Sequence, residues 1–269
     1  VHSDMSFESA KEHALLFRIL AAHLRAHPQS MAPLLQGVDA LCSSATPHLA
    51  PLAPALLSCI MSVAPCTGKF MHMVCAFAML SSIFAQEADN LIPQLVAVIE
   101  TMEVEAYGST LSALTSLFHT DTTCTLSELV SFLQVIALMF QHAPPRSSRA
   151  SDKCFSHLVL SLGPVATHFP TLTKPIVEVL VCVCQYRPHM LRPFDVPRIL
   201  GLLGILLGPR LAGPVHERDA SAIFGGICGV LRSLIRHRKD LIKPCLPHLT
   251  ELLSQQWRLL SHTSSAHTG

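Results

Sequence analysis

The chain has 269 residues, of which half are apolar and only 14% are charged, and its mean hydropathy is +0.43. This length allows one extended helical domain or two small domains with a sizeable core. The high hydropathy leaves two classes open: helices that bury much of their surface against one another, and helices that lie in a membrane.

The apolar runs are too short for the membrane class. A spanning helix needs about 20 consecutive apolar residues. The uncharged stretch 40–68 is interrupted by four prolines, and the cleanest run, 70–85, is short and contains His72. Residues 3–25 form an amphipathic pattern with scattered charges, so no secretory signal is visible. These features favour a soluble helical protein, and the initial Val1 suggests a piece of a longer chain.

Apolar residues recur at helical spacing along nearly the whole chain. The predicted helices cover 7–26, 31–43, 48–62, 69–85, 91–105, 108–119, 125–142, 153–168, 172–186, 194–207, 218–236 and 240–260. The stretch 177–183 is rich in valine and has strand propensity, but no partner strand lies near it in the sequence, so we expect helix there. The pattern predicts an all-α fold.

Two loops are expected. In the stretch 143–151 the tandem prolines Pro144 and Pro145 forbid helix, and the Ser and Arg residues that follow favour solvent. We expect Asp152 to cap the next helix and trypsin to cleave first within this loop. A second loop is expected at 208–217.

A weak internal repeat marks several helix joints. The segments 172–175, 190–193 and 241–244 share an apolar–x–basic–proline pattern, with a basic or histidine-containing turn before each. Single units of this size cannot bury their apolar faces, whereas stacked units can. The sequence therefore predicts a HEAT-like α-solenoid of stacked antiparallel helix pairs.

This repeat pattern also sets the expected domain organisation. We expect one helical-repeat domain over 1–260, with the 143–151 loop as a candidate sub-boundary. The residues 261–269 are polar and are predicted to form a disordered tail.

The sequence contains ten cysteines and sixteen histidines but no complete set of metal ligands. Cys182 and Cys184 lack the two-residue gap of a zinc-binding pair, and no second pair follows at finger spacing. The pairs His72/Cys75 and His23/His27 each lie on one helix face without a third or fourth ligand. Since most cysteines sit in apolar runs, we expect buried thiols in a reduced, intracellular protein with no metal.

Motifs for catalysis or nucleotide binding are also missing. The segment 67–69 (Thr-Gly-Lys) resembles the end of a phosphate-binding loop, but the upstream glycine and a preceding strand are absent. No nucleophile elbow of the Gly-x-Ser-x-Gly type occurs. The glycines at 225–229 are expected to let helices approach closely. We therefore expect a non-enzymatic protein with no cofactor.

Basic residues concentrate in the second half of the chain. Residues 146–269 hold fifteen Lys and Arg against seven acids, whereas 70–145 hold seven acids and neither Lys nor Arg. The candidate partner- or RNA-binding residues are Arg232, Arg236, Arg238, Lys239 and Lys243. They either complement a helix dipole or contact phosphate or an acidic partner, with Asp240 expected to cap the next helix rather than neutralise them.

The C-terminal third resembles a known family. The stretches 219–224, 231–241 and 246–253, with the basic turn Arg236-His-Arg-Lys-Asp-Leu241, are similar to the C-terminal domain of the nucleolar pre-ribosomal-associated, or unhealthy-ribosome-biogenesis (second member), family. The resemblance implies a nucleolar scaffold for assembly of the large ribosomal subunit and for pre-rRNA processing. It also implies partners among other pre-ribosomal assembly factors.

Three functional hypotheses follow from the sequence. The first is this nucleolar scaffold, with pre-rRNA phosphate as a candidate ligand and no membrane contact. The second is a generic HEAT-like adaptor in another intracellular complex. The third is a multi-pass membrane protein, which the apolar run lengths disfavour.

Overall fold

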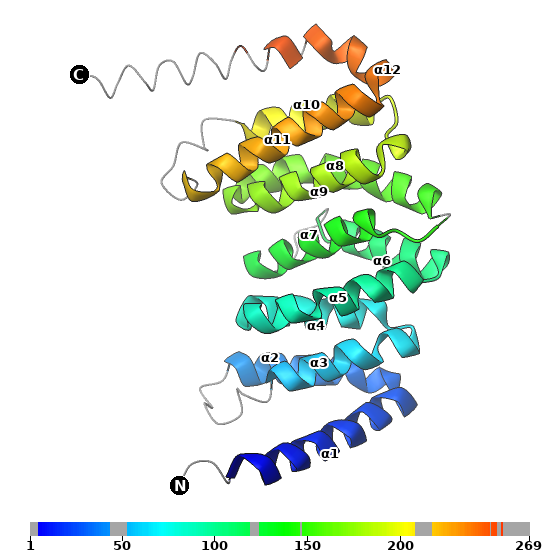
Figure 1. Ribbon diagram of the computed structural model, residues 1–269, viewed down its shortest axis with the longest axis vertical. Helices are drawn as coiled ribbons and strands as arrows, with labels where there is room; N and C mark the ends of the chain where they lie inside the picture. Colours follow the sequence, from blue (N-terminus) through cyan, green and yellow to red (C-terminus); the bar gives the residue numbers. More distant parts are fainter. Residues whose placement is uncertain are drawn as a thin grey trace, which may run out of the picture. The chain divides into compact units, whose positions relative to one another are not determined.

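The computed structural model describes residues 5–43, 53–118, 124–145, 147–207, 217–247, 249–251 and 254. These residues form helices and turns without any strand, so the predicted all-α class is confirmed (Figure 1). The valine-rich stretch 177–183 is helical, as expected. Within the described part of the chain, no helix has the length and hydropathy needed to cross a membrane.

The described helices follow one another along the chain. The α-helices are α1 (Met5–Ala26), α2 (Met31–Ser43), α3 (Ala53–Val63), α4 (Phe70–Ile83), α5 (Ala85–Thr101), α6 (Val104–Ser116), α7 (Leu126–Gln141), α8 (Ser148–His168), α9 (Thr173–Tyr186), α10 (Asp195–Leu206), α11 (Glu217–His237) and α12 (Lys239–Ile242). Short 3₁₀-helices occupy Pro28–Ser30, Pro65–Thr67, Pro170–Leu172, Pro188–Met190 and Lys243–Cys245.

The chain divides into two compact units, Val1–Met102 and Glu103–Gly269. In the first unit α3 packs against α1, α2 and α4, and α4 packs against α5. The side chains of Leu57, Phe77 and Leu80 are fully buried there. Burial of these apolar side chains supplies the main stabilisation of this unit.

The second unit contains two rows of helices. One row stacks α6, α8 and α10, and the other stacks α7, α9 and α11, so each helix packs mainly on the helix two places along the chain. Fully buried side chains such as Phe140, Phe155 and Leu180 fill the interior. The rings of Phe140 and Phe155 meet edge to face, with centroids 5.7 Å apart, a preferred aromatic geometry.

The connection between α7 and α8 is shorter and more buried than the loop predicted at 143–151. Helix α8 already begins at Ser148, so Asp152 lies inside it and does not cap it. Ala143 and Ser147 are buried, and the Ser147 hydroxyl donates a hydrogen bond to the carbonyl of Pro144 at 2.7 Å. The tandem prolines do follow the end of the preceding helix, but the segment between α7 and α8 is shorter than expected, and Ala143, Pro144 and Ser147 are buried in it.

Proline positions account for a second difference. Helix α5 begins at Ala85 rather than at residue 91, and it includes Pro93; helix α8 likewise includes Pro164. Proline removes one backbone hydrogen bond from a helix interior. Both prolines are exposed, so water can reach the carbonyls that lose their partners.

The last predicted helix and the predicted chain ends are only partly described. The helix expected over 240–260 is interrupted by the 3₁₀-helix Lys243–Cys245. Glu217 opens α11, while the rest of the loop expected at 208–217 and the tail at 261–269 lie outside the described residues. The candidate sub-boundary at 143–151 lies within the second unit.

Candidate docking surface at the end of α11

One backbone turn recurs after α8, α9 and α11. It begins at Phe169, Arg187 and Arg238, whose φ angles are −124°, −131° and −131°, and a 3₁₀-helix or short α-helix follows each. Proline follows Phe169 and Arg187 and disfavours helical backbone at the residue before it. The short repeat seen in the sequence therefore corresponds to a repeated local structure.

Arg187 and Arg238 occupy the same position in this turn and make the same type of contact. Arg187 donates hydrogen bonds from Nε to the Phe140 carbonyl at 3.2 Å and from Nη2 to the Ala143 carbonyl at 2.6 Å. Carbonyls at helix ends lack intrahelical partners and accept hydrogen bonds from such basic side chains. Arg187 thus joins the end of α9 to the end of α7.

Arg238 joins the end of α11 to the turn after α9. Its Nη1 donates to the carbonyls of Pro188, at 3.1 Å, and Leu191. Its Nη2 also lies 3.3 Å from a carboxylate oxygen of Asp240, and this hydrogen-bonded pairing lowers the pKa of Asp240. The expectation that Asp240 would not neutralise its neighbours is therefore wrong, and the guanidinium of Arg238 is engaged within the chain.

Helix α11 is held against α9 by small residues. A Cβ atom built on Gly226 would lie 2.4 Å from Cγ1 of Val177, so only glycine fits there without rearrangement. The hydroxyl of Ser233 donates to the Cys184 carbonyl at 2.5 Å. The expectation that glycines in α11 allow close helix approach is confirmed at Gly226, whereas Gly225 faces open space.

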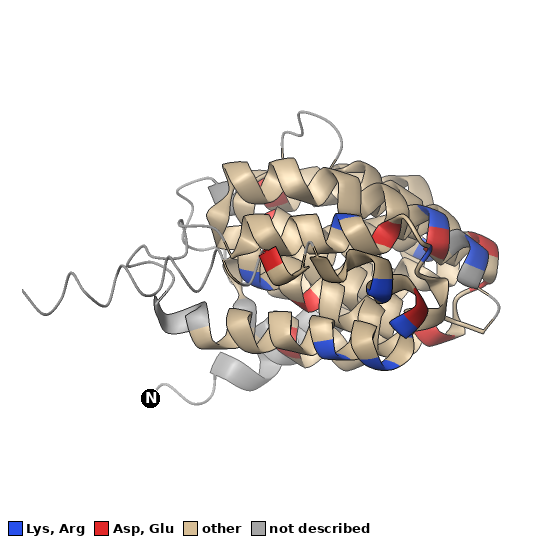
Figure 2. Cartoon of the chain, turned by 90° about the horizontal axis from the view of Figure 1, so that it is seen from above, with Lys and Arg blue, Asp and Glu red and all other residues tan. Residues whose placement is uncertain are grey.

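This packing leaves four basic side chains on the outside. We call Arg232, Arg236, Lys239 and Lys243 the C-terminal basic surface. All four are exposed, and none pairs with an acid in the described part of the chain. Figure 2 shows that charged residues are sparse along the helices, most of which are drawn in tan.

Exposed apolar side chains also occur in the segment 217–247. Phe224 is 60% exposed, Ile235 is 50% exposed and Leu246 is 46% exposed. None of the three is among the site residues predicted from the sequence. The buried face of α11 repeats at helical spacing, at Ile223, Ile227, Val230 and Leu234. Phe224 and Ile235 do not fall on this spacing, so the sequence pattern could have shown that they lie on another face of the helix.

The cysteine and histidine pairs noted in the sequence form no metal site in the described part of the chain. Among the described residues, no group of three or more His, Cys, Asp and Glu side chains could hold a metal ion. Burial raises the pKa of Cys182 to about 11 and that of Cys184 to about 12, so both thiols are protonated at neutral pH. Gly68, in the Thr-Gly-Lys segment, has a φ of 70° and ends the 3₁₀-helix Pro65–Thr67, a usual role for glycine.

Comparison with known proteins agrees with the resemblance carried by the basic turn. Residues 174–269 match the model of the Urb2/Npa2 family, and this region contains nearly all of α9, α10 to α12, Arg187, Arg238 and the C-terminal basic surface. No curated protein and no solved structure gave a significant match. Over residues 174–269 the chain is therefore similar to the Urb2/Npa2 family, and this similarity points to a role in ribosome biogenesis.

Proposed function

We propose that the chain is a non-enzymatic interaction scaffold of HEAT-like helix pairs that acts in nucleolar assembly of the large ribosomal subunit. In this proposal the C-terminal basic surface contacts phosphates of the pre-rRNA, and other surfaces hold pre-ribosomal assembly factors. The observation that carries the proposal is the set of four unneutralised cations inside the region that matches the family model.

The helix arrangement of the second unit supports a scaffold. Its two rows repeat the same packing from one helix pair to the next, and Arg187 and Arg238 repeat the same contact between successive turns. Repeated helix pairs of this kind build extended surfaces on which partners bind.

The chemistry of the surface favours phosphate over bases. The backbone of a nucleic acid attracts Lys and Arg independently of its sequence. Base reading on single strands uses aromatic stacking platforms, and the whole chain has one Trp and two Tyr. Arg232 and Arg236 lie one helical turn apart and therefore on the same side of α11, where both can approach one phosphate backbone.

The first test replaces the four cations of the surface by glutamine in the full chain. Binding of a fluorescently labelled RNA hairpin is followed by anisotropy over a series of salt concentrations. We expect weaker binding. The slope of log K against the logarithm of the salt concentration should be less steep by about 0.7–0.9 for each phosphate that the variant no longer neutralises. Melting should change little, because exposed charges usually contribute less than about 0.5 kcal/mol.

Two controls separate docking from folding. The variant Arg149→Gln/Lys153→Gln removes two exposed cations of α8 and should bind RNA as the parent does. The variant Arg238→Gln should lower the melting temperature, because two carbonyls are deprived of a charged donor. Unchanged affinity and salt dependence in the fourfold variant would contradict the proposal. If the fourfold variant bound RNA normally but no longer bound polyglutamate, the surface would serve an acidic protein partner instead.

A further inference from the structure

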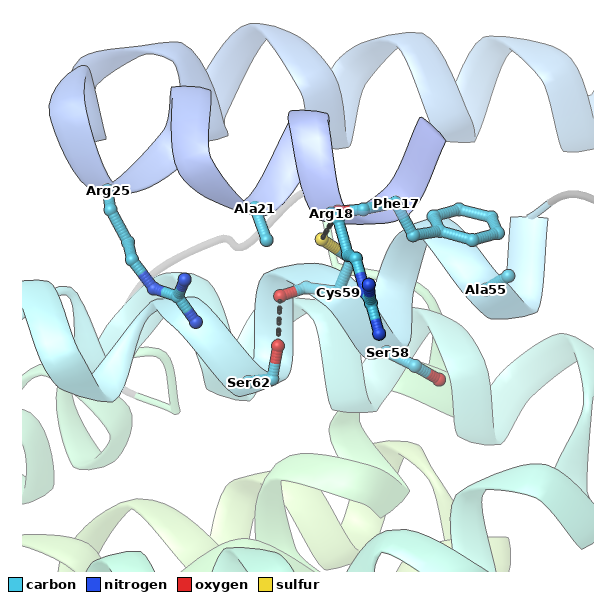
Figure 3. A pocket seen from close by; sticks show the side chains of 8 residues that line it. All are labelled: Phe17, Arg18, Ala21, Arg25, Ala55, Ser58, Cys59 and Ser62. Atoms are coloured by element: carbon cyan, nitrogen blue, oxygen red, sulfur yellow. Dashed lines mark hydrogen bonds between the residues drawn. The ribbon is translucent and has the colours of Figure 1, made fainter. Parts of the chain in front are cut away.

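A groove lies between α1 and α3 in the first unit, and none of its residues falls within the family match. It has a volume of about 440 Å³ and is lined by Phe17, Arg18, Ala21, Arg25, Ala55, Ser58, Cys59 and Ser62 (Figure 3). The first four come from α1 and the others from α3. The groove therefore runs along the seam of two packed helices.

The serine hydroxyls on the floor of the groove already donate hydrogen bonds within the chain. The hydroxyl of Ser58 donates to the Pro54 carbonyl at 2.8 Å, and that of Ser62 donates to the Cys59 carbonyl at 2.8 Å. The thiol of Cys59 is buried, and burial raises its pKa although Arg25 opposes the shift. The floor thus presents uncharged groups and small side chains.

All formal charge in the groove is positive. Arg18 and Arg25 are exposed, and neither pairs with a carboxylate among the described residues. No acidic side chain lines the groove. Both guanidinium groups extend from α1 toward the side of α3 in Figure 3. An occupant that brings two negative charges would therefore neutralise the groove without displacing an internal partner.

The spacing of the two arginines matches a helix. Positions 18 and 25 are seven residues apart on α1, which corresponds to two turns and about 10 Å along the axis. Two acids seven residues apart on another helix have the same separation and also share one face. The small side chains of Ala21, Ala55 and Ser58 let a second backbone come close to the floor.

We propose that this groove binds an amphipathic helix of a partner protein. Two Asp or Glu residues of that helix, seven positions apart, pair with Arg18 and Arg25. Small apolar residues between these two acids lie against the floor of the groove. This is the helix-in-groove mode of peptide recognition. An RNA strand is a poorer occupant, because it would place charged phosphates against an apolar floor with only two cations. The inference does not depend on the C-terminal basic surface.

The test measures binding of a synthetic, alanine-rich helical peptide to the full chain by fluorescence anisotropy. The peptide carries two glutamates seven residues apart with leucine and alanine between them on that face. We expect saturable binding that weakens roughly tenfold when both glutamates become glutamine, and by the same factor in Arg18→Gln/Arg25→Gln. A peptide with its two glutamates five residues apart, on different faces, should bind as weakly as the glutamine peptide.

Two further measurements locate the binding. A photoreactive group at the centre of the peptide should form adducts with Phe17, Ala55 or Ser58. The matched variant Arg149→Gln/Lys153→Gln, which removes two exposed cations outside the groove, should bind the peptide normally. Absence of saturable binding, insensitivity to Arg18→Gln/Arg25→Gln, or adducts elsewhere would overturn the proposal. The proposal would also be overturned if the peptide did not bind and Arg18→Gln/Arg25→Gln abolished the binding of an RNA hairpin.

Discussion

Individual buried polar side chains connect the helices of the second unit. Tyr107 on α6 is fully buried; its hydroxyl donates to the carbonyl of Met139 on α7 at 3.0 Å and accepts from the hydroxyl of Ser151 on α8 at 3.4 Å. Desolvation raises the pKa of Tyr107 to about 12, above the ordinary value of 10.0, although the hydrogen bond from Ser151 opposes it. One phenol thereby joins three helices.

This phenol makes the fold sensitive to alkali. Between pH 10 and 12 the folded state holds the Tyr107 proton more tightly than the unfolded state, so stability falls as pH rises through that range. Tyr107→Phe should cost about 1 kcal/mol at pH 7, because it removes the hydrogen bond to Met139. The difference in stability between the two chains should then change by up to about 2–3 kcal/mol toward pH 12, so that Tyr107→Phe becomes the more stable of the two there. Urea unfolding at several pH values measures both effects.

The exposed Tyr186 provides the matched control for this prediction. Tyr186→Phe removes the same hydroxyl group from an exposed position, so it tests whether the effect of Tyr107→Phe depends on the buried site. The half-buried Cys182 and the buried Cys184 also contribute in alkali, but they are present in every variant, so the difference between variants isolates the phenol. A constant difference between the parent and Tyr107→Phe from pH 7 to 12 would show that Tyr107 ionises freely in the folded state.

At the same scale, the sequence identifies the basic turn but not the different roles of the residues within it. By sequence Arg238 belongs with its basic neighbours, yet its guanidinium is occupied by two carbonyls and Asp240. Aligning the turns pairs Arg238 with Arg187, but only the folded structure shows that Arg187 reaches the carbonyls of Phe140 and Ala143, far earlier in the chain. Long-range acceptors of this kind leave no local pattern.

Among the elements, helix α11 shows most clearly how one position sets a packing distance. Gly226→Ala would place Cβ 2.4 Å from the buried, β-branched Val177, whose χ1 is stiff. Such overpacking should cost about 1–3 kcal/mol. At the neighbouring Gly225 nothing lies within 4 Å of a built Cβ, so Gly225→Ala should stabilise by about 0.5–1 kcal/mol through helix propensity. Urea unfolding of the two variants compares adjacent positions on one helix. Equal shifts in both would mean that α11 does not approach α9 as described.

Helix positions are more predictable than helix ends. The apolar period of 3.6 residues locates most of the helices that the structure describes, because that period reports which face is buried. It fails at the helix predicted over 91–105, which runs across the extended Met102 and Glu103, and at the one predicted over 240–260, which a 3₁₀-helix interrupts. The same period does not locate the start of α8, since Ser147 and Ala143 are buried by tertiary packing and not by local sequence. The predicted start of α5 is wrong because Pro93 suggests a first turn, whereas its exposure lets it lie within the helix.

On the scale of the whole molecule, packing divides the chain between Met102 and Glu103, a joint that nothing in the sequence marks strongly. Both residues have extended backbone, with ψ angles of 138° and 145°, between the end of α5 and the start of α6. The more conspicuous tandem prolines at 144–145 lie inside the second unit. Composition thus shows where a helix is interrupted. It does not show whether the segments on either side of the interruption pack together into one unit.

Two fragments of the chain distinguish these two divisions. A fragment of residues 103–269 keeps both rows of the second unit, and it should show helical circular dichroism and one cooperative urea transition. A fragment of residues 148–269 lacks α6 and α7, and so lacks the packing partners of α8 and α9 and the carbonyls that Arg187 binds. It should retain some helix but unfold with a broad transition and a smaller slope, because less surface is exposed on unfolding. If both fragments unfold with equal cooperativity, the tandem-proline turn separates independent parts and the division at Met102 is not the physical one.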